Sequence, residues 1–214
     1  MSKIDKASNS VFLMDSADFN LVGSDNYQWL GFDALCTSDH TIVVASPGKR
    51  TKLGEQAAGA VYGYNLKDKS VRFALESTED QSKFGSSLSY NKKKNLLAIG
   101  APSRNMGMSY HAGSVFVYDL SSTNLTFSNP KTVFYSRDRG ARFGKRVLWV
   151  NNEDLVLSAP SYTSYNTMGV PNEQGMVYWY TGASNLDGQY SSLFAAKTFA
   201  TTEAGCRHGD TLTL

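Results

Sequence analysis

The chain repeats one ordered set of short motifs three times, and this repetition constrains the fold more than any other feature of the sequence. Each copy opens with an aromatic residue or leucine followed by glycine. An apolar segment then ends in two small residues and a proline, and a second glycine opens a run of β-branched and aromatic residues. Such self-similarity is the signature of a repeat architecture. The copies are Leu30-Gly31, Ala45-Ser46-Pro47 and Gly59 to Tyr64; Phe84-Gly85, Gly100-Ala101-Pro102 and Gly113 to Tyr118; and Phe143-Gly144, Ser158-Ala159-Pro160 and Gly175 to Tyr180.

The spacing of the motifs indicates what one repeat contains. The opening glycines Gly31, Gly85 and Gly144 recur at nearly even intervals. Each interval accommodates four strands of about 5–6 residues with their turns, which is the content of one propeller blade. The distance from the opening glycine to the proline is nearly constant among the copies, whereas the distance from the proline to the second glycine varies more. We therefore expect a rigid first half and a variable loop in the second half.

The residue pattern predicts strands throughout. The glycine-led runs are rich in β-branched and aromatic residues, as strands are. Continuous apolar segments are typical of strands buried on both faces, and polar connectors before them indicate hairpin turns. No segment has a helical period. The apolar segments are Thr41 to Ala45, Leu96 to Ile99 and Leu155 to Leu157, and the connectors are Thr37 to Asp39, Asn91 to Asn95 and Asn151 to Asp154.

The motif residues have structural explanations. A glycine after the aromatic residue permits a backbone conformation or a close approach that a Cβ would block, and the aromatic ring fills space between blades. The proline removes a backbone donor and so ends the ladder. We therefore interpret these residues as building the fold rather than performing chemistry.

This order of motifs resembles the FG-GAP repeat of integrin α-chain β-propellers and of the C-terminal propeller of glycosylphosphatidylinositol-specific phospholipase D. The resemblance covers residues from about Leu30 to Tyr180. It implies an all-β, FG-GAP-type β-propeller with about three complete four-stranded blades, within a propeller of seven blades as in those families. The expected division is 1–29 (end of a blade), 30–83, 84–142 and 143–207 (repeats), and 208–214 (start of a further blade).

The flanks look like partial blades. Ser10 to Met14 is similar to the glycine-led strand at Ser114 to Tyr118, and His208 to Leu214 is similar to Phe84 to Tyr90. The favoured interpretation is a piece of a longer propeller protein, or a shortened relative of one. A four-bladed ring closed by a composite blade, or a ring completed by two chains, are the alternatives. Open sheet edges predict aggregation or dimerisation.

Composition narrows the function classes. The chain has 214 residues, 41% hydrophobic, and a net charge of +2, which argues against nucleic acid as a partner despite basic clusters such as Arg137 to Arg146. These clusters are interpreted as solvated loops. No apolar run approaches the ~18 residues of a membrane span, so membrane insertion is not expected. Cys36 is predicted to be a buried thiol, and with Cys206 it makes no disulfide framework.

The compartment follows from the resemblance rather than from the residues. The families named are extracellular or at the cell surface, and Asn124-Leu125-Thr126 is one glycosylation acceptor pattern. If Met1 is the true start, the absence of an apolar signal core predicts a cytoplasmic chain.

Metal and catalytic sites are not expected in this chain. Many FG-GAP repeats hold calcium in the hairpin between the first two strands, but here only Asn151 to Asp154 offers a run of oxygen ligands, without the turn glycine. Calcium is therefore disfavoured and no cofactor is expected. The three histidines, His40, His111 and His208, share no ligand spacing, so a zinc site would have to lie in another domain.

The resemblance implies that the loops after each triplet and before each opening pair lie on one face, where partners bind. Scaffolded loops commonly carry recognition residues, and Tyr and Arg are favoured at binding hot spots. The loops are Gly48 to Ala58, Ser103 to Ala112, Ser161 to Gln174, Glu76 to Lys83 and Ser136 to Arg142. The candidate ligand-binding residues are Arg104, Tyr110, His111, Tyr162 and Tyr165.

Two functions are consistent with these observations. The first is a non-catalytic propeller module that binds a protein or glycan ligand, or that supports a domain elsewhere in its parent chain. The alternative, implied by the resemblance, is the C-terminal part of a phospholipase-D-like hydrolase that cleaves glycosylphosphatidylinositol (GPI) anchors, with its zinc catalytic domain outside these residues.

Overall fold

The structure is a computed structural model that describes residues 3–5, 10–12, 21–23, 26–51, 56–165, 168, 171–200 and 209–212. Within these residues the regular structure is β, and the helical elements are two 3-10 turns, η1 (Ala183–Asn185) and η2 (Ser192–Phe194). The predicted all-β class is therefore confirmed.

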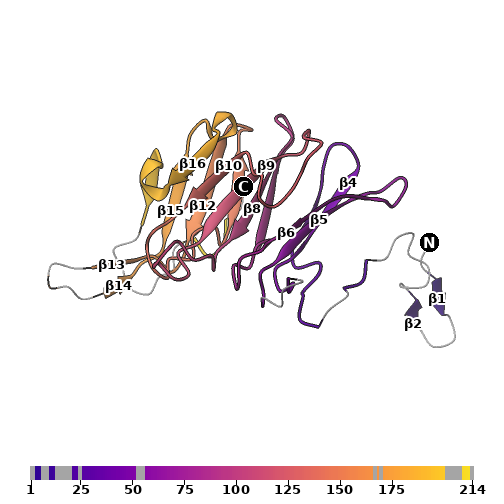
Figure 1. Ribbon diagram of the computed structural model, residues 1–214, viewed down its shortest axis with the longest axis horizontal. Coiled ribbons are helices and arrows are strands. Elements are labelled where there is room, and N and C mark those ends of the chain that lie inside the picture. Colours follow the sequence, from indigo (N-terminus) through magenta and orange to yellow (C-terminus); the bar gives the residue numbers. More distant parts are fainter. Residues whose placement is uncertain are drawn as a thin grey trace.

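Three antiparallel four-stranded meanders form the body of the molecule and lie side by side as propeller blades (Figure 1). In each sheet the strand that comes first in the sequence lies at one edge, and these first strands contact one another. The division of the chain into repeats, and the number of blades, stay predictions. The first sheet has β3 (Ala34–Cys36), β4 (Thr41–Ser46), β5 (Ala60–Asn65) and β6 (Val71–Glu76); the second has β7 (Ser87–Asn91), β8 (Leu96–Ala101), β9 (Ser114–Asp119) and β10 (Thr132–Tyr135); the third has β11 (Val147–Val150), β12 (Asp154–Ala159), β15 (Met176–Tyr180) and β17 (Lys197–Phe199).

Side chains of the second sheet divide between two cores because successive residues of a strand point to opposite faces. In β8, Leu97 and Ile99 pack toward the first sheet, whereas Leu96 and Ala98 pack toward the third. Every residue of β8 is buried. The prediction that this apolar segment is covered on both faces is therefore confirmed.

The opening glycine and the triplet are joined by one hydrogen bond that recurs in all three copies. The N–H groups of Gly31, Gly85 and Gly144 donate to the first carbonyl of the triplet, at 2.9, 3.0 and 2.8 Å. These glycines have φ values of 87°, 95° and 85°, a region that favours glycine. The proline follows at the second position of a tight turn, where its fixed φ is suited. The turns close from Lys49 N–H to Ser46 O, Arg104 N–H to Ala101 O and Tyr162 N–H to Ala159 O.

The second glycine of the first two repeats forms the junction with the sheet that follows. Gly59 pairs with Phe84 and Gly113 pairs with Phe143 through parallel bridges. The Phe84 ring is fully buried and meets Phe116 edge-on at 5.4 Å. The prediction that the aromatic residue fills space between blades is therefore confirmed.

The start of the expected further blade lies against the third sheet. Gly209 has a φ of 91°, and its α-carbon faces Ser158 and Val177. Gly144 faces Ser114 and Val115 in the same way at the preceding junction. His208 lies outside the described residues.

Three strand pairings were not predicted. β16 (Gly188–Ser191) adds a parallel strand to the outer edge of β10, held by hydrogen bonds from Gly188 N–H to Lys131 O and from the Thr132 hydroxyl to Leu186 O. It covers an otherwise open edge of the second sheet. Two hairpins, β1 (Lys3–Asp5) with β2 (Ser10–Phe12) and β13 (Thr163–Tyr165) with β14 (Pro171–Glu173), complete the regular structure. Leu13 and Met14 of the predicted terminal strand lie outside the described residues.

The prediction for Cys36 was wrong, because its thiol is exposed. In β3 only Leu35 packs toward the core between the first two sheets. Cys36 alternates to the opposite face of the strand, where it is exposed. The residue pattern of a single strand does not indicate which face of that strand a neighbouring sheet covers.

Candidate binding face

The loops that the sequence analysis assigned to one face are joined to one another by backbone hydrogen bonds. Within a repeat, Lys83 N–H donates to Ala57 O and Arg142 N–H donates to His111 O, at 3.0 and 3.1 Å. Between repeats, Ser103 N–H donates to Ser82 O and Ser161 N–H donates to Ala141 O, at 3.2 and 3.3 Å. These loops therefore form one continuous surface at one end of the sheets, which we call the loop face.

The residue just before each opening pair has the same unusual backbone conformation. Trp29, Lys83 and Arg142 have φ values of 54°, 53° and 56°. Residues other than glycine adopt this left-handed region uncommonly. The partial fourth copy has Arg207 at this sequence position, outside the described residues.

These residues line two adjoining hollows in the loop face, which share Lys83, Ser103 and Arg142. We call the two together the central pocket. Their volumes are about 350 and 200 Å³. The first is also lined by Gln56, Ala57, Gln81 and His111, and the second by Trp29, Phe32, Pro47, Ser86, Pro102 and Lys145.

The central pocket is electropositive. Among the described residues its lining includes Lys83, Arg142 and Lys145 and no carboxylate. Burial lowers the pKa of Lys145, and the charges of Arg146, Arg142 and Lys83 lower it further, while Asp210 acts in the opposite direction. The lowered pKa reports both partial desolvation and a concentration of positive charge at this point of the surface.

Arg104 is already engaged within the protein. Its guanidinium forms a two-point ion pair with the Glu79 carboxylate, at 2.5 and 2.7 Å, and lies 5.0 Å from the centroid of the Phe116 ring. Paired hydrogen bonds of this kind fix both side chains. Arg104 therefore ties the loop after the second triplet to the loop before the second opening pair.

Tyr110 and His111 lie next to each other in the loop after the second triplet. Tyr110 is 54% exposed, with the Arg139 guanidinium 5.5 Å from its ring centroid. His111 lines the central pocket. Of the five candidates, His111 is the residue that the structure places beside the pocket cations.

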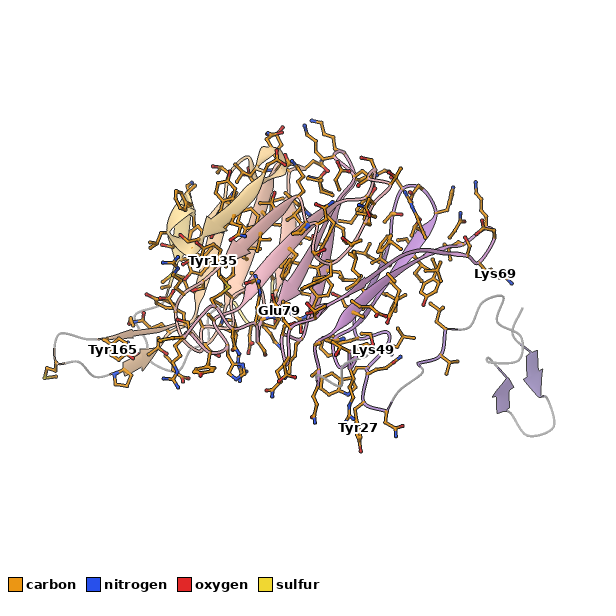
Figure 2. The ribbon with its side chains drawn as sticks, viewed as in Figure 1. Tyr27, Lys49, Lys69, Glu79, Tyr135 and Tyr165 are labelled. Atoms are coloured by element: carbon orange, nitrogen blue, oxygen red, sulfur yellow. The ribbon has the colours of Figure 1, made fainter. Side chains whose placement is uncertain are left out.

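Tyr162 and Tyr165 follow the third triplet and differ in exposure. Tyr162 is partly buried against the core between the second and third sheets, and burial raises its pKa, with a smaller contribution from Asp138. Tyr165 is 71% exposed on β13. Figure 2 shows Tyr165 on the hairpin that projects from the body of the molecule.

In each of the two acidic connectors an aspartate stabilises the fold. Asp154 accepts hydrogen bonds from the Trp179 indole at 2.9 Å and from Gly182 N–H at 2.8 Å. Asp39 pairs with Arg72. Among the described residues there is no group of three or more His, Cys, Asp or Glu side chains placed to hold a metal ion.

The predicted glycosylation residue lies on the surface. Asn124 is exposed in the loop between β9 and β10, while the nearby Leu125 and Phe127 pack against the core. No helix within the described part of the chain is long and apolar enough to cross a bilayer.

The sequence analysis missed Lys83, Arg142 and Lys145 as candidate residues. The first two end loops that it assigned to the binding face, but the cluster from Arg137 to Arg146 was interpreted as solvated loop. The signal available was a basic residue directly before the opening pair in Lys83-Phe84-Gly85 and Arg142-Phe143-Gly144.

Comparisons with known proteins identify no family for the chain. No protein-family model matches the chain. The chain is 22% identical over 203 residues to phosphatidylinositol-glycan-specific phospholipase D of Mus musculus and 25% identical over 205 residues to that of Bos taurus. Each match covers 79% of this chain and 24% of the relative, so the chain spans about a quarter of their length.

Solved structures with some likeness include Sqt1 of Saccharomyces cerevisiae and the β-propeller domain of the Trilobed protease from Pyrococcus furiosus. For Sqt1 the identity is 15% and the TM-score 0.43, covering 69% of this chain and 28% of that chain. For the protease domain the identity is 12% and the TM-score 0.47, covering 82% and 44%.

Proposed function

We propose that this chain is a non-catalytic β-propeller module that binds a protein or glycan partner through its loop face. The central pocket carries the proposal, because it joins loops from successive repeats and its cations form no ion pair with any carboxylate of the described residues. Tyr110, which precedes the pocket residue His111, and Tyr165 on the projecting hairpin are also exposed and have large contact surfaces suited to recognition. Rigid sheets holding adaptable loops are a common arrangement for binding.

Binding by the loop face is tested with arrays of glycans and of recombinant extracellular protein domains. We expect at least one ligand to bind, and a Tyr110→Ser/Tyr165→Ser variant to bind it about tenfold more weakly, because exposed aromatic residues contribute strongly to such contacts. The affinity is measured by surface plasmon resonance on the purified chain.

Leu66→Ser is the matched control for that experiment. Leu66 is 42% exposed in the turn between β5 and β6, at the opposite end of these strands from the loops named above, and its N–H donates to His40 O. This variant should retain the affinity of the unmodified chain. Equal binding by all three proteins, or no ligand on either array, would contradict the proposal.

A second candidate function is supported by the similarity to phosphatidylinositol-glycan-specific phospholipase D. This chain would then be the C-terminal part of a hydrolase of that kind, and the zinc catalytic domain would lie elsewhere in its parent. Release of a GPI-anchored reporter from cells by the parent protein tests this candidate. An inactive parent, folded and loaded with zinc, would count against it.

We also propose an extracellular or cell-surface location, with Asn124 glycosylated. The exposed position of Asn124 supports the proposal, since glycan transfer requires an accessible loop. When the chain is directed into the secretory pathway of a eukaryotic cell, N-glycosidase treatment should increase its electrophoretic mobility. Asn124→Gln should abolish that change. Secreted protein that lacks a glycan would refute the modification.

A further inference from the structure

The cations of the central pocket have no partner among the residues that the structure describes. Lys83 and Lys145 are half-buried and Arg142 is exposed. Their side chains form no ion pair or hydrogen bond with any described residue. The charge of Asp210 favours protonated Lys145, but Asp210 and Lys145 form no ion pair. Partly desolvated ammonium groups such as those of Lys83 and Lys145 are unfavourable without an anion in contact with them, so an anionic group would stabilise this arrangement.

The backbone holds these side chains in place without a ligand. Hydrogen bonds from Lys83 N–H to Ala57 O and from Arg142 N–H to His111 O fix two residues in the left-handed conformation. A left-handed conformation is unfavourable for a long basic residue, whereas glycine adopts it freely. If only the shape of the loop mattered, glycine would be the more stable residue at these positions. Such positions tend to collect where a side chain has a function.

The other groups in the pocket indicate what accompanies the anion. Ser103 and His111 supply hydrogen-bonding groups beside Lys83 and Arg142. The adjoining hollow is lined by apolar surface from Trp29, Phe32, Pro47 and Pro102, with the rings of Trp29 and Phe32 stacked 6.3 Å apart. A small inorganic anion would make no contact with this apolar surface. A sugar ring has an apolar face as well as hydroxyl groups, and therefore matches both halves.

We propose that the central pocket binds the sulfate or phosphate ester of a saccharide, with the ester oxygens on Lys83, Arg142 and Lys145 and the sugar ring against Trp29 and Phe32. This assignment rests on the proposed binding function and specifies the ligand class. The Arg142 guanidinium can donate two parallel hydrogen bonds to an oxyanion, whereas the lysines act as mobile point charges.

The probes are glucose 6-sulfate, glucose 6-phosphate, glucose and inorganic sulfate, added to isotope-labelled protein and followed by two-dimensional NMR. We expect one of the esters to bind at least about tenfold more tightly than glucose or inorganic sulfate, because charge-assisted and ring contacts act together. The amide signals of Lys83, Ser103 and Arg142 should move. A Lys83→Gln/Arg142→Gln variant should bind that ester about tenfold more weakly.

The matched control is Lys92→Gln/Lys93→Gln, which removes the same charge from two exposed lysines in the turn between β7 and β8. It should bind the ester within about twofold of the unmodified chain, because it leaves the pocket intact. Dispersed NMR spectra establish that both variants fold. Arg142→Lys keeps the charge and should retain part of the affinity.

Several outcomes would overturn the assignment. Equal loss of affinity in both double variants would indicate non-specific attraction to positive charge. Equal binding of inorganic sulfate and both esters would show that the sugar ring does not contribute to recognition. No binding by either ester would show that the central pocket is not a site for this ligand class. If the esters fail while an array ligand still depends on Tyr110 and Tyr165, the proposed binding function stands and only this assignment falls.

Discussion

Gly113→Ala is expected to lower the free energy of unfolding by more than about 3 kcal/mol, because it forces apart the backbones of two blades. An added Cβ would lie 2.2 Å from Phe143 O and 2.5 Å from Phe143 N, and the φ of 89° is itself unfavourable for alanine. Backbone atoms cannot move aside as the end of a flexible side chain can. Urea denaturation followed by tryptophan fluorescence measures the change.

Gly107→Ala is the control that separates two effects of such a substitution, the steric clash of the added Cβ and the cost of a positive φ. Gly107 has a φ of 60°, and nothing lies within 4 Å of a Cβ built there. This variant should lose about 1 kcal/mol, the cost of the left-handed conformation. Similar losses for the two variants would mean that the junction between the second and third sheets is not as described.

Phe84→Ala is expected to lower the free energy of unfolding by about 3–5 kcal/mol, because it leaves a cavity where two sheets meet. The ring is fully buried and meets Phe116 and Phe127 edge-on at 5.4 and 5.3 Å. The same denaturation experiment measures the loss, and its slope shows whether unfolding remains a single transition.

Phe84→Leu is the matched substitution because the first copy has Leu30 at this position. It keeps most of the volume and should lose less than about 1.5 kcal/mol. If Phe84→Ala were as mild as Phe84→Leu, the aromatic residue would not be filling the space between blades.

The sequence predicted the sheets well because their determinants are local and repeated. A glycine with positive φ, a turn proline and a continuous apolar strand each act within a few residues, so Phe84-Gly85 and Leu96 to Ile99 could be interpreted one copy at a time. Three copies in register reduced the remaining ambiguity. The pairing of β16 with β10 joins segments that are far apart in the sequence, and no local pattern predicts it.

The candidate residues were harder to predict because their roles depend on which side chains from different loops lie close together in the folded chain. Arginine is a residue type favoured at binding hot spots, yet the Arg104 guanidinium is paired with the carboxylate of Glu79 from another loop. Lys83 and Lys145 are separated in the sequence by the whole second sheet but line one hollow. Cys36 shows the same limit in the core, since its exposure depends on which face of β3 a neighbouring sheet covers.

The account depends most on the stacking of successive sheets, which brings basic residues from separate repeats into one pocket. A crystal structure of the chain tests this directly. We expect parallel bridges from Gly59 to Phe84 and from Gly113 to Phe143, with Lys83, Arg142 and Lys145 around a single hollow. Sheets that stack in another order, or these three side chains on different faces, would contradict it.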